Sequence, residues 1–509
     1  MSSIRHSLAI SLIGRYVQIG IQLVSYFILA RLLTPTDIGL FSVASAAIGI
    51  AQVFREFGVG SYLIQEKELN ERKIATAFTL TLLIGSIMFL SLYFLAPIIA
   101  GFYKDERLID VFRLLAFNFL IIPLNSTSLS LLRRDMKFTA IFWINTFAAL
   151  VGVTVAISLS YYGYGYYSLV WSSLGNTLAT GIAVSFFRQG GMFHRITLCE
   201  WKAISAFGSQ MTVTSITSEI SSNANDLILG RILGFAQTGI VSRAQGIMYL
   251  FHRDITAAIR GVAFPAFATA HRENRNLEAD FIKSVTILTV FAWPFYGFFS
   301  LYPIEALRLF FGPQWDEAGP LVPWFCAGGA VAATCSLIPT LLPALGGVKY
   351  LVRLHLLVDP LRIATFAAVL YVFRTTEAFA ITFLVFFMLS TPLIFYFKNK
   401  VLPTRYKALI AGLFKSLLVS AFALAIPALL VGWIYAESIG FFQNVTHEHL
   451  TWLYKTPNTR YLKDWLLIPI GALMVPSWIL GLIVTRHPLA DEAAFKKIVF
   501  YRIGGKCAA

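Results

Sequence analysis

A stretch of fourteen residues recurs in similar form two hundred positions later in this chain, and each copy joins two long apolar segments. The first copy reads RLLTPTDIGLFSVA at 31–44, and the second reads RILGFAQTGIVSRA at 231–244. The matching residues are Arg31 and Arg231, Leu33 and Leu233, Gly39 and Gly239, Ser42 and Ser242, and Ala44 and Ala244. This repeat predicts two similar halves, a construction typical of transporters whose substrate site lies between the halves.

The residues around the repeat are too apolar for a soluble protein. Hydrophobic residues make up 57% of the 509 positions, charged residues only 13%, and the mean hydropathy is +0.71. Fourteen apolar runs are long enough to cross about 30 Å of hydrocarbon as helices at about 1.5 Å per residue. They are too long for barrel strands. The predicted spans are 7–30, 38–58, 74–100, 109–132, 138–160, 164–187, 203–230, 237–266, 281–302, 318–343, 350–373, 377–397, 408–436 and 465–485.

The fold class predicted from these spans is an all-α polytopic membrane protein with two six-helix lobes. The repeat places the N-terminal lobe at 1–200 and the C-terminal lobe at 201–402. Residues 403–509 hold two further helices and a tail that alternates charged and apolar residues. This alternation predicts an amphipathic helix on the membrane surface, with disorder as the alternative.

Lysine and arginine outside the spans predict the orientation in the membrane. Connections on the side of the amino terminus, together with Lys283 and Arg353 in the first turn of the spans that follow, hold 24 of these cations, and connections on the opposite side hold nine. Because short cytoplasmic loops are enriched in Lys and Arg, both termini are predicted to be cytoplasmic. The net charge of +15 is then mostly a consequence of topology and requires no nucleic-acid partner.

Motifs for catalysis are absent from the sequence. We find no nucleotide-binding loop, zinc spacing or nucleophile elbow, and the four cysteines show neither metal-ligand spacing nor a disulfide framework. The loops leave little room for a soluble catalytic domain. We therefore expect a transporter without a metal or cofactor, and not an enzyme.

Charged residues inside the spans are the main candidates for a substrate site. Arg55, Arg113 and Lys415 lie near predicted helix ends, where snorkelling to the interface is the alternative to a functional role. An arginine near the bilayer centre costs at least about 2.5 to 3.5 kcal/mol, so deeper ones usually face a cavity or a partner. The deeper arginines are Arg15, Arg243, Arg253, Arg260 and Arg362. A cavity lined by guanidinium groups suits a phosphate or diphosphate, so we expect an anionic, amphiphilic substrate.

Two acid–base pairs occupy comparable places in the two halves. Arg55 and Glu56 lie near the end of the second span, and Arg253 and Asp254 lie 198 residues further on. These pairs are candidates for pseudo-symmetric gates. The alternative is local neutralisation between neighbours, because adjacent residues of a helix do not face each other.

Further acids in the spans are candidates for ion coupling. Glu219 and Asp226 share one face of the polar seventh span, which either lines a water-filled cavity or packs through interhelical hydrogen bonds. In the eleventh span His355, Asp359 and Arg362 follow helical spacing on one side. Such a stripe predicts either a proton relay or a static Asp–Arg ion pair. His252 is better explained as a polar packing residue.

Several strings together resemble a known family. They are RLLTPTDIGLFSVA at 31, EFGVGSYLIQ at 56, YGYGYYSLVW at 162, NANDLILGRILG at 223 and LFFGPQWDEAGPLV at 309. As a set they resemble the Wzx-type flippases, in the polysaccharide-transport branch of the multidrug/oligosaccharidyl-lipid/polysaccharide (MOP) exporter superfamily, and in particular the colanic-acid-type exporters.

The resemblance implies a function as well as a fold. It implies a flippase that moves undecaprenyl-diphosphate-linked oligosaccharide from the cytoplasmic to the periplasmic leaflet of the bacterial inner membrane, for exopolysaccharide or O-antigen biosynthesis. Membrane lipids, a polysaccharide polymerase and export machinery are the implied partners. A peptidoglycan-precursor flippase and a multidrug cation antiporter are alternatives within the superfamily, although the arginines disfavour cations. A membrane polymerase or ligase of lipid-linked glycans is the alternative of another class.

Overall fold

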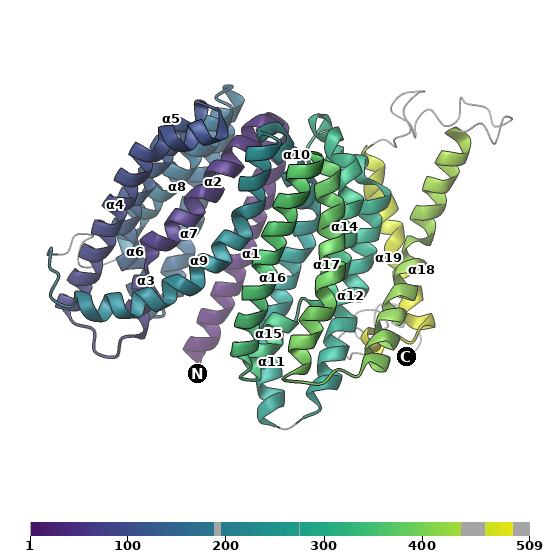
Figure 1. Cartoon of the computed structure of the whole chain (residues 1–509). Helices are drawn as coiled ribbons and strands as arrows, with labels where there is room; N and C mark the ends of the chain where they lie inside the picture. The colour runs from purple at the N-terminus through teal and green to yellow at the C-terminus, as the bar shows by residue number, and fades with distance from the viewer. Residues whose placement is uncertain (1, 188–194, 274, 439–463, 492–509) are drawn as a thin grey trace, which may run out of the picture. The chain divides into compact units, whose positions relative to one another are not determined.

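The computed structural model describes residues 2–187, 195–273, 275–438 and 464–491, and every regular element in those ranges is a helix. Contacts between helices divide the chain into two compact units, Met1–Ile240 and Val241–Ala509. Figure 1 shows the helices of each unit in order along the chain. We call them unit 1 and unit 2 and describe each by itself.

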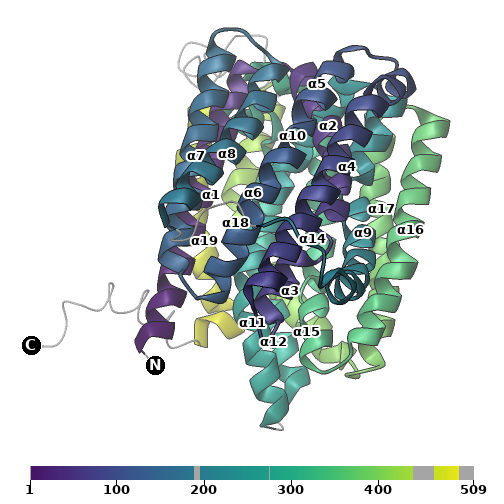
Figure 2. The same cartoon turned by 90° about the vertical axis from the view of Figure 1, so that its left-hand side faces the viewer.

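Unit 1 contains the first nine helices and the beginning of the tenth. In Figure 2 α7 and α8 run side by side, and α1 and α8 are the main neighbours of α7. α9 lies along α2. The bounds are α1 Ser2–Leu32, α2 Pro35–Glu56, α3 Val59–Gln65, α4 Glu71–Tyr103, α5 Arg107–Ala116, α6 Asn118–Arg134, α7 Phe138–Tyr161, α8 Tyr166–Phe187, α9 Trp201–Ile232 and α10 Phe235–Tyr249.

Local sequence signals set both ends of α2. At its start the Thr34 side chain accepts a hydrogen bond from the Asp37 backbone N–H, and the Asp37 carboxylate accepts one from the Thr34 backbone, which forms a capping box. At its end Phe57 and Gly58 both adopt left-handed backbone angles, with φ of 39° and 61°. Glycine tolerates this region without a side-chain clash. The resulting turn starts the short helix α3 in a new direction.

Unit 2 contains the remaining helices. Its irregular feature is a π-helical segment, η1, between α10 and α11, and such segments occur frequently at functional sites. The bounds are η1 Leu250–Ile255, α11 Thr256–Arg272, α12 Leu277–Leu301, α13 Pro303–Phe310, η2 Pro313–Leu321, α14 Val322–Cys335, α15 Ile338–Ala344, α16 Val348–Phe373, α17 Thr376–Asn399, α18 Tyr406–Ser438, η4 Asp464–Leu466, α19 Leu467–Val484 and η5 Pro488–Asp491.

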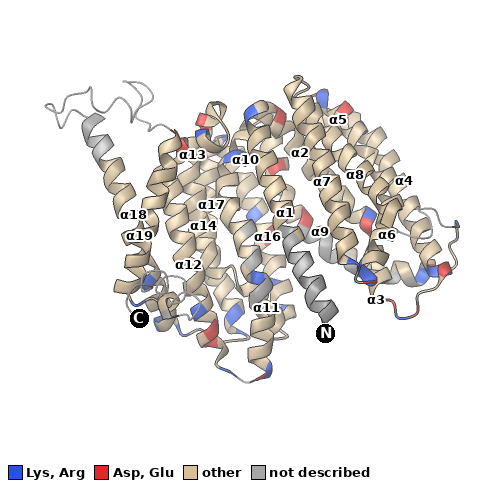
Figure 3. Ribbon diagram, turned by 180° about the vertical axis from the view of Figure 1, so that it is seen from behind, with Lys and Arg blue, Asp and Glu red and all other residues tan. Residues whose placement is uncertain are grey.

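The predicted spans agree with the observed helices. In the described residues eleven segments are long and apolar enough to cross a membrane. One of them consists of α5 and α6 together, and another consists of η2, α14 and α15 together. The other three predicted spans coincide with α1, with the polar α9, and with α10, η1 and α11 together. Figure 3 shows that Lys, Arg, Asp and Glu gather mostly towards helix ends. The prediction of an all-α polytopic membrane protein is confirmed, and helices occupy all fourteen predicted spans.

Two predicted features concern the ends of the lobes. The helix that the repeat places at the start of the second lobe, α9, has its contacts in unit 1, and α18 and α19 belong to unit 2 with α12. The lobe boundaries at 200 and 402 remain a prediction from the repeat. Most of the amphipathic tail predicted after 487 lies outside the described residues.

A candidate polar pocket in unit 1

Unit 1 contains a pocket of about 330 Å³ among α2, α3, α4, α6 and α8. This volume lies at the lower end of the range of small-molecule sites. Two arginines and one glutamate line it together with hydroxyl and amide side chains, so its formal charge is positive. The main polar lining residues are Arg55, Glu56, Asn125, Thr127, Ser130 and Arg133.

Arg55 is the most constrained charge of the pocket. It lies in the last turn of α2, where a cation interacts favourably with the helix dipole, and it is only 8% exposed. Its Nε atom is buried and has no hydrogen-bond partner. Glu56 and Arg133, also on the pocket, are exposed. A buried N–H without a hydrogen bond is costly.

Asn125 and Thr127 on α6 also have buried polar atoms without a hydrogen-bond partner. Asn125 is 3% exposed and donates its amide N–H to the Thr177 carbonyl at 3.0 Å, while its Oδ1 has no partner. Thr127 is 2% exposed, and its hydroxyl has no partner either. Most buried polar atoms in proteins are hydrogen-bonded. Three residues that line one pocket, Arg55, Asn125 and Thr127, therefore each have a buried polar atom without a partner.

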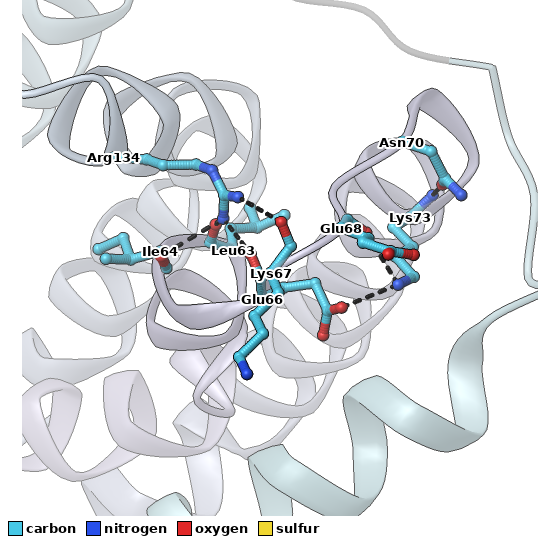
Figure 4. A network of polar contacts seen from close by, with 8 residues as sticks. All are labelled: Leu63, Ile64, Glu66, Lys67, Glu68, Asn70, Lys73 and Arg134. Atoms are coloured by element: carbon cyan, nitrogen blue, oxygen red, sulfur yellow. Dashed lines mark hydrogen bonds and ion pairs between the residues drawn. The ribbon is translucent and has the colours of Figure 1, made fainter.

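The helix α3 forms one wall of the pocket, and Arg134 binds to the end of this helix. Its guanidinium donates hydrogen bonds to the backbone carbonyls of Leu63 at 2.8 Å and of Ile64 at 3.3 Å, which lie at the end of α3 (Figure 4). The Lys73 ammonium bonds the Glu66 carboxylate at 2.9 Å, and this hydrogen bond lowers the pKa of Glu66. These contacts attach α3 and the loop after it to α6 and α4. Arg134 therefore positions the lining residues of α3.

The structure also locates the predicted cations of unit 2. Arg243 is 5% exposed and stacks on the rings of Trp315 and Phe311, with its Cζ 5.2 and 5.6 Å from their centroids. Arg260 donates from Nε to the Ser336 carbonyl at 3.0 Å. Arg243 is thus packed against aromatic rings, whereas Arg260 is held at the break between α14 and α15. The side chains of Arg15, Arg253 and Asp254 lie outside the described part of the structure.

The predicted stripe on α16 is brought together. His355 Nδ1 lies 3.0 Å from Asp359 Oδ2, and Arg362 Nη2 lies 3.9 Å from Asp359 Oδ1. The His355 side chain is 52% exposed, whereas those of Asp359 and Arg362 are 14% and 22% exposed. The contacts fit either a relay or an ion pair, and a role in ion coupling remains a prediction.

The acids of α9 lie against α2 within unit 1. Asp226 Oδ2 accepts a hydrogen bond from the Ser42 hydroxyl at 2.5 Å, and Ser42 belongs to the repeated stretch. Glu219 accepts from the Asn223 side chain at 2.9 Å, and both side chains approach Gly49 of α2. The polar face of α9 therefore takes part in interhelical packing. A coupling role for Asp226 and Glu219 stays a prediction.

Sequence reasoning missed the hydroxyl and amide part of the pocket. The string NSTSLS at 125–130 interrupts the apolar span of α6, and four of its five polar members line the pocket. This polar run was a usable signal, because polar groups inside a membrane span usually face a protein partner or a cavity. No group of three or more His, Cys, Asp and Glu side chains that could hold a metal occurs among the residues the structure describes.

Comparison with known proteins agrees with the fold and the sequence strings. A solved structure of the lipid II flippase MurJ in an inward closed conformation has a TM-score of 0.70 and 11% sequence identity to this chain. The alignment covers 94% of this chain and 99% of the MurJ chain. An inward-facing MATE family multidrug resistance transporter of the MOP superfamily has a TM-score of 0.57, with 14% identity over 75% of this chain and 96% of its own. At these identities the likeness shows a shared fold.

Sequence relatives identify the family. The lipopolysaccharide biosynthesis protein WzxC of Escherichia coli (strain K12) is 24% identical over 66% of this chain and 68% of its own length. The succinoglycan biosynthesis transport protein ExoT of Rhizobium meliloti (strain 1021) is 25% identical over the same shares. The family model for polysaccharide biosynthesis proteins matches residues 28–320, more than half of the chain. This multi-pass membrane protein therefore belongs to the polysaccharide biosynthesis protein family and has the fold of MOP-superfamily transporters.

Proposed function

We propose that the protein is a flippase for undecaprenyl-diphosphate-linked oligosaccharide in the bacterial inner membrane. It moves the repeat unit from the cytoplasmic to the periplasmic leaflet by alternating access, for exopolysaccharide or O-antigen biosynthesis. A polysaccharide polymerase and the export machinery receive the product. The protein transports and does not catalyse a covalent step.

The observation that carries this proposal is a cationic, hydroxyl-rich pocket inside an apolar unit of a polysaccharide biosynthesis protein. Polar groups buried between apolar helices are costly unless a partner or a polar substrate uses them. The relatives named for lipopolysaccharide biosynthesis and for succinoglycan transport support a saccharide cargo. The two-fold repeat supports alternating access, because similar halves can rock about a central site.

The direct test removes the gene from its host and follows the lipid-linked saccharide. We expect surface polysaccharide to disappear while lipid-linked oligosaccharide accumulates where an enzyme added from the periplasmic side cannot reach it. Purified protein in liposomes should then transfer that lipid-linked saccharide between leaflets. Transfer of a peptidoglycan precursor in its place would favour the alternative flippase, and chain extension of the glycan would favour a polymerase.

Replacing the deeper arginines tests the cationic cavity. We expect Arg260→Ala and Arg362→Ala to lower export strongly at normal abundance, because each removes a guanidinium that can grip a diphosphate with two hydrogen bonds. Lysine at these positions should restore export only in part, since an ammonium keeps the charge but loses the fork geometry. Arg72→Ala, at an exposed arginine of α4, is the matched control. Full export by both alanine variants would rule out this mechanism.

The orientation is testable with reporter fusions. Fusions after Arg107 and Arg308 and within 437–464 should report a periplasmic location, and fusions at 133–137, 398–407 and the carboxyl terminus a cytoplasmic one. The expectation follows from the distribution of 24 against nine cations between the two sides. A periplasmic carboxyl terminus would contradict the even number of spans.

A further inference from the structure

We propose that the polar pocket of unit 1 binds a single sugar ring, and that Arg55, Asn125 and Thr127 recognise its hydroxyl groups. The inference rests on the proposed function, because it names the part of the lipid-linked saccharide that this pocket takes. In this proposal the pocket binds the sugar, and cations elsewhere in the protein bind the diphosphate.

Three hydroxyl groups of the pocket act as hydrogen-bond acceptors. A threonine or serine hydroxyl has one proton and two lone pairs. Thr81 donates its proton to the Ala77 carbonyl at 2.7 Å, Ser130 to the Ser126 carbonyl at 2.9 Å, and Thr180 to the Asn176 carbonyl at 2.8 Å. Because these protons are already used along the helices, the oxygens offer lone pairs to a ligand. Donors on a ligand would match these three oxygens.

The pocket also offers donors. Arg55 has a buried Nε–H without a partner, and Arg133 contributes a second guanidinium. Asn125 adds an acceptor without a partner, because its amide N–H donates to the Thr177 carbonyl while its Oδ1 accepts no hydrogen bond. A ligand matched to this set needs donors and acceptors in one small body. Sugar hydroxyls have both, whereas an ionised diphosphate esterified at both ends accepts from the guanidinium groups but has no proton to donate to these three hydroxyl oxygens.

Size and apolar lining agree with one ring. A volume of about 330 Å³ lies at the lower limit for small-molecule sites, too small for a whole oligosaccharide. Val59, Ile122 and Leu129 line the same pocket and can pack against the C–H faces of a sugar. Of the three charged lining residues, Glu56 and Arg133 are exposed and Arg55 is buried.

The chain offers a matched pair of variants for the test. Thr127 and Thr146 are both buried threonines of unit 1, at 2% and 8% exposure, and the hydroxyl of each lacks a partner. Only Thr127 lines the pocket. Valine replaces threonine at nearly the same volume, so Thr127→Val and Thr146→Val remove the same group inside and outside the site. Size-exclusion profiles and melting temperatures check that both variants fold.

The experiment measures binding to the purified full-length protein in detergent. The probes are methyl glycosides of glucose, galactose, fucose and glucuronic acid, with inorganic phosphate and pyrophosphate as competitors, read by ligand-observed NMR. We expect at least one glycoside to bind, and Thr127→Val to weaken it about threefold to tenfold, the effect of one lost hydrogen bond. Thr146→Val and phosphate should change nothing. Absence of glycoside binding, displacement by phosphate, or equal loss in both variants would overturn the proposal.

Transfer in liposomes separates this inference from the proposed function. Glycoside binding that depends on Thr127, in a protein that transfers no lipid-linked saccharide, would support the pocket and contradict the flippase. Transfer by a protein that binds none of the glycosides would support the flippase and contradict the pocket.

Discussion

Replacing Gly39 by alanine is expected to abolish export and to lower the melting temperature of the protein strongly. A Cβ atom at Gly39 would lie closer than 3.0 Å to the Phe235 carbonyl oxygen, and one at Gly239 equally close to the Pro35 carbonyl oxygen. The two contacts are related by the repeat, because Pro35 and Phe235 occupy the same position in its two copies. Overpacking typically costs about 1–3 kcal/mol, and a backbone carbonyl cannot move aside as a side chain can.

The control for this prediction is Gly101→Ala on α4, where an added Cβ would meet nothing within 4 Å. There we expect export and melting temperature to stay near the wild-type values, since alanine is favoured over glycine in a helix by about 1 kcal/mol. Gly239→Ala should reproduce the defect of Gly39→Ala. Wild-type melting temperatures and wild-type export in both Gly39→Ala and Gly239→Ala would contradict a structural role for the close approach of the two copies.

Replacing Lys398 by methionine is expected to destabilise unit 2 by about 3–5 kcal/mol, the usual cost of leaving a buried charge unpaired. Lys398 is fully buried at the end of α17 and bonds the Glu278 carboxylate at the start of α12. It also donates to the Thr404 hydroxyl at 3.0 Å, and Glu278 accepts from the Arg405 backbone N–H at 3.1 Å. The change is measured as a fall in melting temperature in detergent.

The matched control is an exposed ion pair of the same unit, Arg275 with Glu273, whose side chains are 54% and 57% exposed. Arg275→Ala should alter stability by at most about 1 kcal/mol, because solvent screens exposed pairs. The double variant Lys398→Met, Glu278→Gln should recover part of the loss, since the unpaired carboxylate is removed as well. Equal melting temperatures for Lys398→Met and Arg275→Ala would contradict a buried ion pair at this position.

The ion pair shows where reading the charges of the sequence was incomplete. Lys398 directly follows the predicted span 377–397, so the sequence places it among the cytoplasmic cations. Its partner lies 120 residues earlier in the chain, a distance over which no local spacing applies. The same holds for Arg243, which appeared as a cavity candidate and lies against Phe311 and Trp315. A charge inside a span is visible in the sequence, but its partner is not.

The amino-acid sequence alone determined the class, the fourteen spans and the two-fold repeat of this protein. These features depend on local hydropathy and on self-similarity, because a helix in a membrane must satisfy its backbone within the segment. Only the tertiary structure decided where the polar pocket lies. Arg55, Asn125 and Thr180 come from three different helices, and their convergence depends on how α2, α6 and α8 pack. Packing brings together residues that are far apart in the chain, and a single sequence does not show which of them come into contact.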